Sequence, residues 1–356
     1  MEKLRLAILK NERQEDDHRW KEACAERQDE VVLDEVDLTR ADWLEQIREG
    51  SYDGLLARPP AYTAPFRNLY EERVRILHEV DGYPIWPAPK EIALYENKKF
   101  LAYWLKAHGV PHPPTYVFYY QEEALDFIRT ATLPLVGKTN IGASGTGVRI
   151  LRSAEQAAEY VQQVFSGKGA PRRGVPAWKK KGFLGRALRR LANPRKLTAQ
   201  LQLYSAVRSK SQRDFVIFQD FVPHQFEWRC VRIGDSFFAH KKMLEGDMAS
   251  GSLIKGYDNP PLELLDFVRE LTDKHGFRSQ AVDLFVSVEG KYLVNEMQCL
   301  FGQSDPYQML VDGQPGRYLF QDGSWQFEAG DFNRYESYLL RLDDFLARLK
   351  MGQAIT

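Results

Sequence analysis

The sequence feature that most constrains the fold is a pair of apolar segments near the C-terminus that each carry one carboxylate. Residues 281–285 read AVDLF and residues 292–297 read YLVNEM, with a short polar turn between them. This pattern predicts two strands joined as an antiparallel hairpin. A carboxylate inside such a strand costs free energy unless a cation lies close to it. We therefore expect Asp283 and Glu296 to face each other and to share a cation; a solvent-exposed pair at a sheet edge is the alternative.

The predicted partner of this pair is magnesium. Carboxylate oxygens together with nucleotide phosphates are typical Mg²⁺ ligands. Gln298 follows Glu296 by two residues, which places both side chains on the same face of the strand. The predicted metal ligands are therefore Asp283, Glu296 and Gln298.

A glycine-rich turn lies between two other apolar segments, in the sequence LPLVGKTNIGASGTGVRIL. Glycine allows backbone conformations in which successive N–H groups approach an anion closely. Lys138 ends the first of these segments and adds a positive charge. A strand rather than a helix follows the turn, so it is neither a P-loop nor a dinucleotide fingerprint. The candidate phosphate-binding residues are Lys138, Gly142, Ser144, Gly145, Thr146 and Gly147; a flexible hairpin tip is the alternative.

A third apolar strand, residues 217–222, reads IFQDFV and is followed by Glu227 and Arg229. An apolar strand that leads into a loop can pack against a purine and contact its edge through backbone groups. An acidic residue just beyond it can hold ribose hydroxyls. This pattern alone is not specific.

The first 95 residues alternate between strand and helix patterns. Strands are predicted at residues 4–9 and 54–57, and a helix at residues 66–80. Such alternation predicts an open parallel sheet, whose ligands bind beyond the carboxyl ends of the strands. Arg58 lies at such an end, where it either contacts substrate or is solvated. A final amphipathic helix is predicted at residues 334–349.

These patterns divide the chain into four parts. Residues 1–95 form an N-terminal α/β domain, and residues 96–165 form a central subdomain with the glycine-rich hairpin. Residues 166–213 are a basic insertion with 14 Lys and Arg and no Asp or Glu. Residues 214–356 form a C-terminal subdomain with the carboxylate pair. The predicted fold class is therefore mixed α/β and α+β.

Composition excludes several classes of protein. The chain has 49 basic and 49 acidic residues, so its net charge predicts no nucleic-acid partner. Its three cysteines form no CxxC pair, which favours a reducing compartment over a disulfide framework. No segment approaches the roughly 18 apolar residues of a membrane span. The N-terminus is typical of a first strand rather than a signal peptide. The expected location is the cytoplasm.

The order of these features resembles the ATP-grasp superfamily, over roughly residues 90–305. Lys98 opens a helix, Lys138 precedes the glycine-rich hairpin, and the carboxylate pair comes last. The likeness is closest to the carboxylate–amine ligases of the D-alanine–D-alanine ligase, glutathione synthetase and glutamate-ligase kind. In such enzymes two α+β subdomains grip ATP between them, after a preceding α/β domain.

The resemblance implies a role for each candidate residue. Lys98 and Lys138 would contact the nucleotide phosphates under the hairpin of residues 142–147. The adenine pocket would be lined by Gln219, Asp220 and Val222, and Glu227 would hold the ribose. Asp283 and Glu296 would bind Mg²⁺. Arg229 and Lys242 would stabilise the transferring phosphoryl group. Ser250 and Ser252 would lie in a loop beside the acceptor.

The sequence also departs from the family pattern. The family's metal motif E-x-N is replaced by Glu296-Met297-Gln298, in which the amide lies one methylene further out. D-Alanine ligases carry an arginine two residues before the metal aspartate, where this chain has Ala281. This difference argues against synthesis of D-alanyl-D-alanine.

The implied activity is an ATP- and Mg²⁺-dependent ligation of a small carboxylate to an amine. The reaction forms a C–N bond through an acyl phosphate and releases ADP and phosphate. Three alternatives stay open: a phosphotransferase on the same scaffold, a non-catalytic ATP-binding regulator, and a glycan- or nucleic-acid-binding module.

The basic insertion also allows three interpretations. It is a surface insertion without a specific role, a site for an anionic glycan acceptor, or a contact with an anionic membrane surface. The last two would connect the ligase with polysaccharide biosynthesis at the inner face of the membrane. The oligomeric state stays open, and a homodimer is one assembly that the sequence allows.

Overall fold

The structure is a computed structural model that describes residues 3–12, 17–60, 64–142, 147–170, 212–245, 248–249 and 254–352. The chain forms two compact units. The larger unit comprises Met1–Ala61, Pro65–Pro113 and Val222–Thr356, and the smaller comprises Tyr62–Ala64 and Pro114–Phe221. The finer division at residues 95, 165 and 213 remains a prediction, and most of the basic insertion lies outside the described residues.

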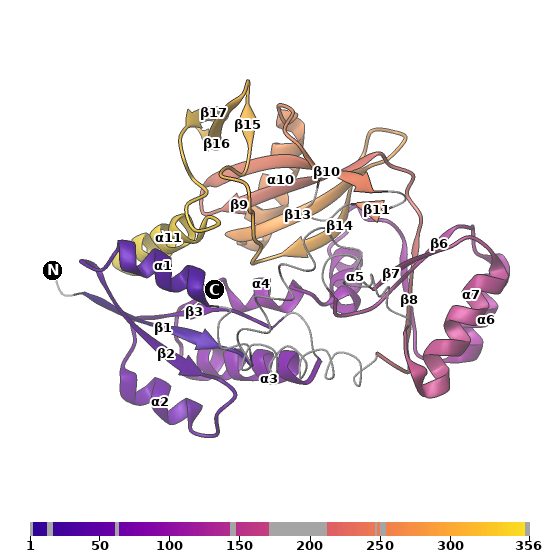
Figure 1. The fold of residues 1–356 in the computed structure, drawn as a ribbon, viewed down its shortest axis with the longest axis horizontal. Coiled ribbons are helices and arrows are strands. Elements are labelled where there is room, and N and C mark those ends of the chain that lie inside the picture. The colour runs from indigo at the N-terminus through magenta and orange to yellow at the C-terminus, as the bar shows by residue number, and fades with distance from the viewer. Residues whose placement is uncertain are drawn as a thin grey trace, which may run out of the picture. The chain divides into compact units, whose positions relative to one another are not determined.

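The N-terminal part of the larger unit contains a four-stranded sheet, and all its strand pairs are parallel. Its strand order is β2-β1-β3-β4, which confirms the open parallel sheet predicted from the sequence. Figure 1 shows helices α1 and α11 on one side of this sheet and helices α2 and α3 on the other. The bounds are β1 (Leu4–Lys10), α1 (His18–Glu26), β2 (Val31–Asp37), α2 (Trp43–Gly50), β3 (Gly54–Ala57), α3 (Ala64–Arg75), β4 (Ile85–Trp86) and α11 (Tyr338–Lys350).

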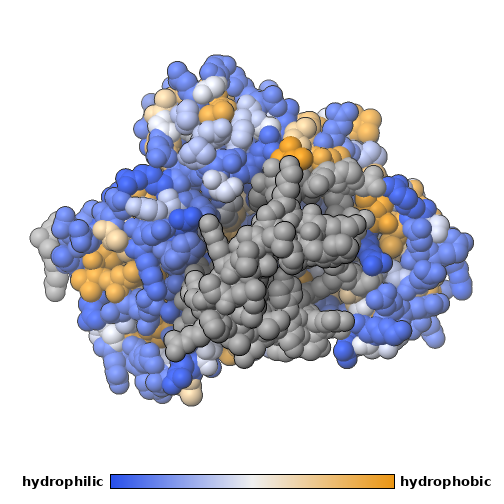
Figure 2. Space-filling model, in the orientation of Figure 1, coloured by the Kyte–Doolittle hydropathy of each residue, from blue (hydrophilic) through white to orange (hydrophobic). Residues whose placement is uncertain are grey.

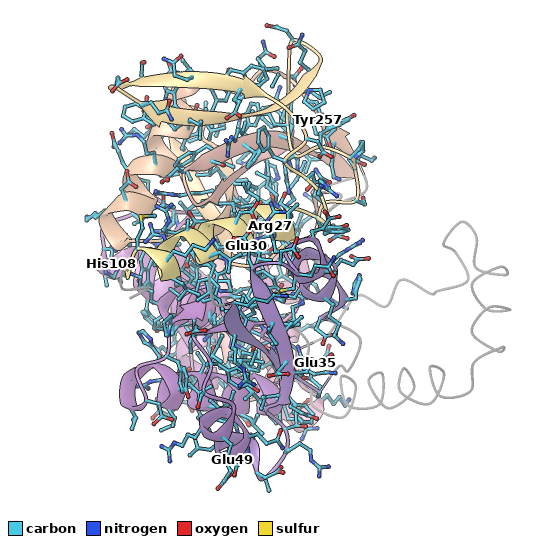
Figure 3. All side chains as sticks on the ribbon, turned by 90° about the vertical axis from the view of Figure 1, so that its left-hand side faces the viewer. Arg27, Glu30, Glu35, Glu49, His108 and Tyr257 are labelled. Carbon is cyan, nitrogen blue, oxygen red and sulfur yellow. The ribbon has the colours of Figure 1, made fainter. Side chains whose placement is uncertain are left out.

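The C-terminal helix α11 is anchored on this sheet by packing and by charge. A Cβ placed on Gly54 of β3 would lie 2.6 Å from the ring of Phe345, so glycine lets the helix approach the strand. Arg27, just after α1, donates from Nε to Asp343 Oδ1 at 2.7 Å. Figure 3 labels Arg27 and Glu30, which forms an ion pair with Lys350 of the same helix. The last helix is therefore a structural element, as its apolar stripe predicts.

The larger unit also contains a nine-stranded sheet whose strand pairs are antiparallel. Its main order is β14-β13-β9-β10-β16-β15, with β11 and β12 paired to β10 and β17 paired to β16. One face packs with helices α4, α5 and α10 in a core that includes Trp228, Val282 and Leu264. The bounds are α4 (Pro89–Leu94), α5 (Lys98–Ala107), β9 (Phe226–Ile233), β10 (Ser236–Glu245), β11 (Met248–Ala249), β12 (Lys255–Gly256), α10 (Leu262–His275), β13 (Ser279–Val286), β14 (Tyr292–Gln298), β15 (Leu310–Val311), β16 (Gln314–Gln321) and β17 (Ser324–Ala329).

Successive side chains along these strands point to opposite faces of the sheet, and the charged ones lie on the face that does not pack with α10. Trp228 and Cys230 of β9 belong to the core with α10, whereas Arg229 between them does not. On β13, Val282 and Leu284 belong to the same core and flank Asp283. Since successive strand residues point to opposite faces, Arg229 and Asp283 share the face opposite α10.

The smaller unit is a four-stranded antiparallel sheet of order β5-β8-β6-β7. Phe218 and Tyr160 are part of the core that it shares with its two helices. Lys138 lies opposite Val148, which confirms the predicted arrangement of strand, glycine-rich turn and strand. The bounds are β5 (Thr115–Phe118), α6 (Gln121–Thr130), β6 (Leu135–Lys138), β7 (Val148–Leu151), α7 (Ala154–Gln163) and β8 (Val216–Asp220).

Three predictions of helix bounds need correction. The predicted final helix begins at residue 334, but α11 begins at Tyr338 because Tyr335, Glu336 and Ser337 have φ values of 52°, 59° and 63°. The sequence also predicts a helix at residues 154–165. This helix and the one predicted at residues 66–80 end earlier as α-helices and continue as short π-helices, Val164–Lys168 and Ile76–Val80.

The surface and the cysteines give no sign of a membrane span or a disulfide in the described part of the chain. None of its helices combines the length and the apolar character needed to cross a bilayer. Figure 2 shows a face on which the coloured residues are mostly hydrophilic and the hydrophobic ones form small separate groups. Cys24, Cys230 and Cys299 are buried and free.

Candidate active site

The carboxylates of Asp283 and Glu296 are directly opposite each other on β13 and β14. The pairing register then shifts, because Leu284 pairs with Val294 and leaves Asn295 as an extra residue. Such a β-bulge re-aims side chains. Asn295 Nδ2 donates to Glu227 Oε1 on β9 at 3.2 Å, so Asn295 reaches the same face as the carboxylate pair.

Asp283 is buried and is held by two cations. Arg229 donates from Nε to Oδ1 at 2.7 Å and from Nη2 to Oδ2 at 2.8 Å, and Lys242 Nζ donates to Oδ2 at 2.8 Å. Lys242 also donates to Glu227 Oε2 at 2.8 Å. Burial alone would raise the pKa of Asp283, but the charges of Arg229 and Lys242 outweigh it and hold this pKa below its usual range. Asp283 is therefore ionised.

Glu296 pairs with a different cation. Lys98 Nζ lies 3.4 Å from Glu296 Oε1 and 3.5 Å from Glu96 Oε2. Asn97 fixes the start of α5, because its side chain accepts the backbone N–H of Phe100 at 3.4 Å. Burial would lower the pKa of Lys98, but the charges of Glu96 and Glu296 outweigh it and raise this pKa. Sequence analysis missed Glu96, whose only signal is its position two residues before Lys98.

His240 is a further member of this face that sequence analysis missed. It lies opposite Arg229 on β10, two residues before Lys242. Its Nδ1 is 2.9 Å from the carbonyl oxygen of Gln308. Burial and then the charge of Arg229 lower the pKa of His240 to about 3, so its imidazole is neutral at pH 7. A neutral ring beside Arg229 adds no positive charge to the network.

The network holds one more carboxylate than cation. Its ion pairs form two sets, one around Lys98 and the other around Asp283. The two sets meet where Asp283 and Glu296 lie opposite each other. A face with excess negative charge favours a further cation. The members are Glu96, Glu227, Asp283 and Glu296 on one side and Lys98, Arg229 and Lys242 on the other.

The other candidate residues belong to the smaller unit. Lys138 is 9% exposed at the end of β6, and its carbonyl oxygen accepts the hydroxyl of Tyr160 at 3.5 Å. Gln219 Nε2 donates to Thr115 Oγ1 at 3.0 Å, so this amide stabilises the sheet. Burial raises the pKa of Asp220 on the same strand.

The entrance and exit of the glycine-rich turn are held together by specific contacts. Thr139 N donates to the carbonyl oxygen of Gly147 at 2.9 Å, and a Cβ on Gly147 would collide with Thr139 Oγ1. Glycine is therefore required at 147. Gln212 donates from Nε2 to the carbonyl oxygen of Ile141 at 2.7 Å, a contact that sequence analysis missed. Gly142 is described, whereas the candidate residues Ser144, Gly145 and Thr146 lie outside the described residues.

The structure thus brings some candidate residues together and leaves others apart. The charge network in the larger unit contains six of them: Lys98, Glu227, Arg229, Lys242, Asp283 and Glu296. Gln298 is opposite Ala281 on the same sheet, and Val222 begins the last segment of this unit. Lys138, Gln219 and Asp220 lie in the smaller unit, so a site shared by the two sets remains a prediction. Ser250 and Ser252 lie outside the described residues.

The sequence of this chain is similar to known proteins over a short segment. No family model matches the chain. The trifunctional purine biosynthetic protein adenosine-3 of Bos taurus and that of Homo sapiens are each 34% identical to it over 83 residues. This segment is 23% of the chain but only 8% of either relative.

The similarity of structure extends over almost the whole chain. D-Alanine–D-alanine ligase from Bacillus anthracis, in complex with ATP, matches with a TM-score of 0.56 at 14% identity. The match covers 98% of this chain and 99% of that ligase. This chain has the ATP-grasp fold.

Two other ATP-grasp structures match at similar levels. N5-carboxyaminoimidazole synthetase from Staphylococcus aureus, in complex with ADP, has a TM-score of 0.52 at 12% identity and covers 85% of this chain and 71% of that one. The biotin carboxylase domain of the Hydrogenobacter thermophilus 2-oxoglutarate carboxylase, with MgADP and bicarbonate, has a TM-score of 0.52 at 14% identity and covers 86% and 66%. These identities establish the fold and leave the substrates open.

Proposed function

We propose that this ATP-grasp protein is an ATP- and Mg²⁺-dependent ligase that joins a carboxylate to an amine. The observation that carries the proposal is the charge network on the nine-stranded sheet. Asp283 and Glu296 face each other within it, and three cations contact its carboxylates. Buried charge of this kind costs folding free energy, so a role in binding a charged substrate accounts for it.

The residues present fit a magnesium ion that is completed by a nucleotide. In the part of the chain that the structure describes, no three His, Cys, Asp or Glu side chains could hold a metal ion by themselves. Mg²⁺ in nucleotide sites is usually bound by one or two carboxylates together with substrate phosphates. Asp283 and Glu296 supply two such carboxylates, and Gln298 on the same strand is a third candidate. When bound, the ion would neutralise phosphate charge.

The proposed reaction has two steps. A carboxylate oxygen of the first substrate attacks the γ-phosphorus of ATP, the bond from that phosphorus to ADP breaks, and an acyl phosphate forms. The amine nitrogen then attacks the acyl carbon. The C–N bond forms, the bond from carbon to the phosphate oxygen breaks, and phosphate leaves while the nitrogen loses a proton. Positioning and electrostatic stabilisation supply most of the rate enhancement in such transfers.

The side chains of this chain have separate roles in that scheme. Lys98 and Lys138 bind phosphate oxygens, and Glu227 binds the ribose beside the adenine-contacting Gln219, Asp220 and Val222. Arg229 and Lys242 stabilise charge that develops on the transferring phosphoryl group. Their contacts with Asp283 hold both cations in place before substrate arrives, so little reorganisation is needed during the reaction.

The test is a substrate screen with a matched pair of variants. The full chain is incubated with Mg-ATP and pairs drawn from uronic-acid sugars and amino acids, and products are identified by mass spectrometry. ADP, phosphate and a new amide that require both substrates would support the ligase. Glu296→Gln should lose this activity. Glu289→Gln, in the turn of the same hairpin and paired with Lys291 at 2.9 Å, should keep it.

Other outcomes of the screen lead to other functions. A phosphorylated acceptor would identify a phosphotransferase. Nucleotide binding without turnover of any pair would favour a regulator.

We also propose that the basic insertion binds an anionic glycan acceptor, because residues 166–213 hold 14 basic and no acidic side chains. Most of this segment lies outside the described residues. A variant with Lys179, Lys180 and Lys181 changed to Glu should bind an acidic polysaccharide at least about tenfold more weakly, because each lost cation removes favourable electrostatic attraction. Unchanged binding would overturn the glycan proposal, and loss of binding to anionic liposomes instead would indicate a membrane contact.

A further inference from the structure

A hairpin at one end of the nine-stranded sheet has no part in the reaction scheme above. Its strands β16 and β17 are joined by the turn Asp322-Gly323, whose φ values of 50° and 75° are typical of a type I′ hairpin. Figure 1 shows this hairpin beside β15, at the end of the sheet away from β14. Strand β17 pairs with β16, and the described part of the chain places no strand on its other side. Strand β17 is therefore an edge strand.

Among the described strands, two others of similar length lie at sheet edges, and both are protected. Strand β2 has the sequence VVLDEVD, in which three residues are acidic. Strand β14 is covered, because Val294 N donates to the carbonyl oxygen of Pro111 at 2.8 Å. Strand β17 has the sequence SWQFEA, and the charge of Glu328 is balanced by Arg317 of β16 at 2.7 Å. Because proteins usually protect edges with charge, proline or a covering segment, an unprotected edge indicates a place for another strand.

The register of the hairpin identifies the backbone groups that β17 presents outward. Gly330 N donates to the carbonyl oxygen of Pro315 at 2.9 Å, so residue 330 bonds toward β16. In an antiparallel pair, every second residue bonds to the neighbouring strand. The even-numbered residues of β17 therefore bond toward β16. The N–H and C=O groups that point away from β16 belong to Trp325, Phe327 and Ala329.

This edge is held in position by packing within its own chain. Trp325 Nε1 donates to Asp266 Oδ1 of α10 at 3.1 Å, and the ring of Trp325 lies 5.1 Å from that of Phe237. The ring of Phe327 lies 5.5 Å from that of Tyr318. A strand that is already fixed loses little conformational freedom when it pairs with another, so more of the interaction energy remains for association.

We propose that β17 pairs antiparallel with β17 of a second copy of this chain and forms a dimer with two-fold symmetry. When Phe327 lies opposite the partner's Phe327, Trp325 lies opposite the partner's Ala329. All three outward residues of each strand are then paired, and about six backbone hydrogen bonds join the copies. A shift of the register by two residues leaves one outward residue of each strand without a partner.

The exposed side chains of β17 are complementary to one another in this register. Gln326 lies opposite the partner's Glu328 in a pair without backbone hydrogen bonds, where side chains approach most closely. Gln326 Nε2 donates one N–H to Ser324 Oγ at 2.8 Å and keeps a second. Glu328 Oε2 accepts from Arg317 Nε at 2.8 Å, and Oε1 accepts no hydrogen bond from the described residues. The amide of each copy can therefore donate to the carboxylate of the other.

The test measures the association of the full chain by sedimentation equilibrium. Because the interface consists mainly of one strand, we expect a dissociation constant on the order of micromolar. Ala329→Pro removes an N–H that points outward and leaves the bonds to β16, so it should weaken association at least about tenfold. Gln326→Glu should also weaken it at least about tenfold, because two-fold symmetry places two carboxylate pairs opposite each other. Gln326→Lys should associate at least as tightly as wild type.

Gln321→Glu is the matched control, because it makes the same change at an exposed position of β16, away from the edge. This variant should associate like wild type. A wild-type chain that stays monomeric well above micromolar concentration would overturn the inference, as would association that Ala329→Pro leaves unchanged. Equal association of the Gln326→Glu and Gln326→Lys variants would also overturn it. If Ala329→Pro fails to fold, the two Gln326 variants, which change an exposed side chain, still decide the inference.

Discussion

Arg229 is the cation that lowers the pKa of Asp283 most. Its guanidinium makes two hydrogen bonds to the buried Asp283 and is itself only 12% exposed. A planar guanidinium matches a carboxylate in this way, and an ammonium does not. Arg229 therefore has a structural role on this face besides the role proposed for it in the reaction.

Removal of this guanidinium should destabilise the protein. Arg229→Met leaves Asp283 with Lys242 as its one remaining cation in the network, and breaking a buried ion pair from one side costs about 3–5 kcal/mol. We expect the free energy of unfolding, measured by urea denaturation, to fall by about that amount. Arg129 has a side chain that is 78% exposed and pairs with Asp126, so Arg129→Met should change this free energy by less than about 1 kcal/mol. A loss as small for Arg229 as for Arg129 would contradict the structural role.

The sequence predicts those residues of this face that stand out in a sequence pattern. It does not predict the residues that reach the face only through the pairing of strands. Asp283 and Glu296 were predictable because a charged residue stands out inside an apolar strand. Asn295 was not, because it joins the face through a bulge that the alternation of apolar residues does not reveal. His240 was missed for a similar reason, since its proximity to Arg229 depends on the pairing of β9 with β10.

At the scale of the elements, helix α4 is held to strand β13 by one buried carboxylate. Glu91 is 1% exposed and accepts the backbone N–H groups of Arg278 at 2.9 Å and Ser279 at 2.7 Å. It also accepts the N–H of Ala88 at 3.1 Å, which caps its own helix. Burial raises the pKa of Glu91 to about 7, although these three hydrogen bonds oppose the shift.

This raised pKa predicts a stability that falls with increasing pH. Because the folded state holds the proton more tightly than the unfolded state, the contribution is full below about pH 4 and is lost as pH rises through 7. Between pH 5 and pH 8 the loss should be about 2–3 kcal/mol. Glu91→Gln lacks this titration, so the difference in unfolding free energy between wild type and variant isolates it.

His240 changes the stability with pH in the opposite direction, and this contribution cancels in the difference between wild type and Glu91→Gln. Its folded pKa of about 3 is depressed, so its contribution is present above about pH 6.5 and is lost as pH falls, equally in both proteins. Urea denaturation at pH 5 and pH 8 provides the measurement. A difference between wild type and Glu91→Gln that does not change with pH would show that Glu91 is ionised throughout.

Elements with strong periodicity were predicted well, and weakly patterned ones were missed. Strand β8, the strands β13 and β14 that carry Asp283 and Glu296, and the helix α5 that Lys98 opens follow clear apolar patterns. Strand β2, with the sequence VVLDEVD, was missed because its charged residues interrupt the alternation. Strands β16 and β17 were missed because both have many half-exposed residues, so neither reads as a buried strand. The start of α11 was misplaced because three residues in left-handed conformations precede it.

At the scale of the whole molecule, the candidate residues are divided between two compact units. Lys138 and Gln219 belong to the smaller unit, whereas Lys98 and the carboxylate pair belong to the larger. A nucleotide bound by both sets would couple the stability of the two units by mass action, since a ligand present at one hundred times its Kd stabilises the folded state by about 2.7 kcal/mol. Hydrogen exchange reports such stabilisation separately for each element.

We therefore predict that Mg-ADP slows amide exchange in β6 of the smaller unit and in β13 and β14 of the larger unit together. Removal of the metal with EDTA should reverse both effects, because Asp283 and Glu296 would then face phosphate without a cation between them.

Lys138→Ala should weaken Mg-ADP binding at least about tenfold and reduce protection in both units, because a lost phosphate contact lowers the occupancy of the whole site. Arg129→Ala, at an exposed position of helix α6 in the same smaller unit, should leave both effects intact. Protection confined to one unit, or unaffected by Lys138→Ala, would mean that the two sets of residues do not bind one nucleotide.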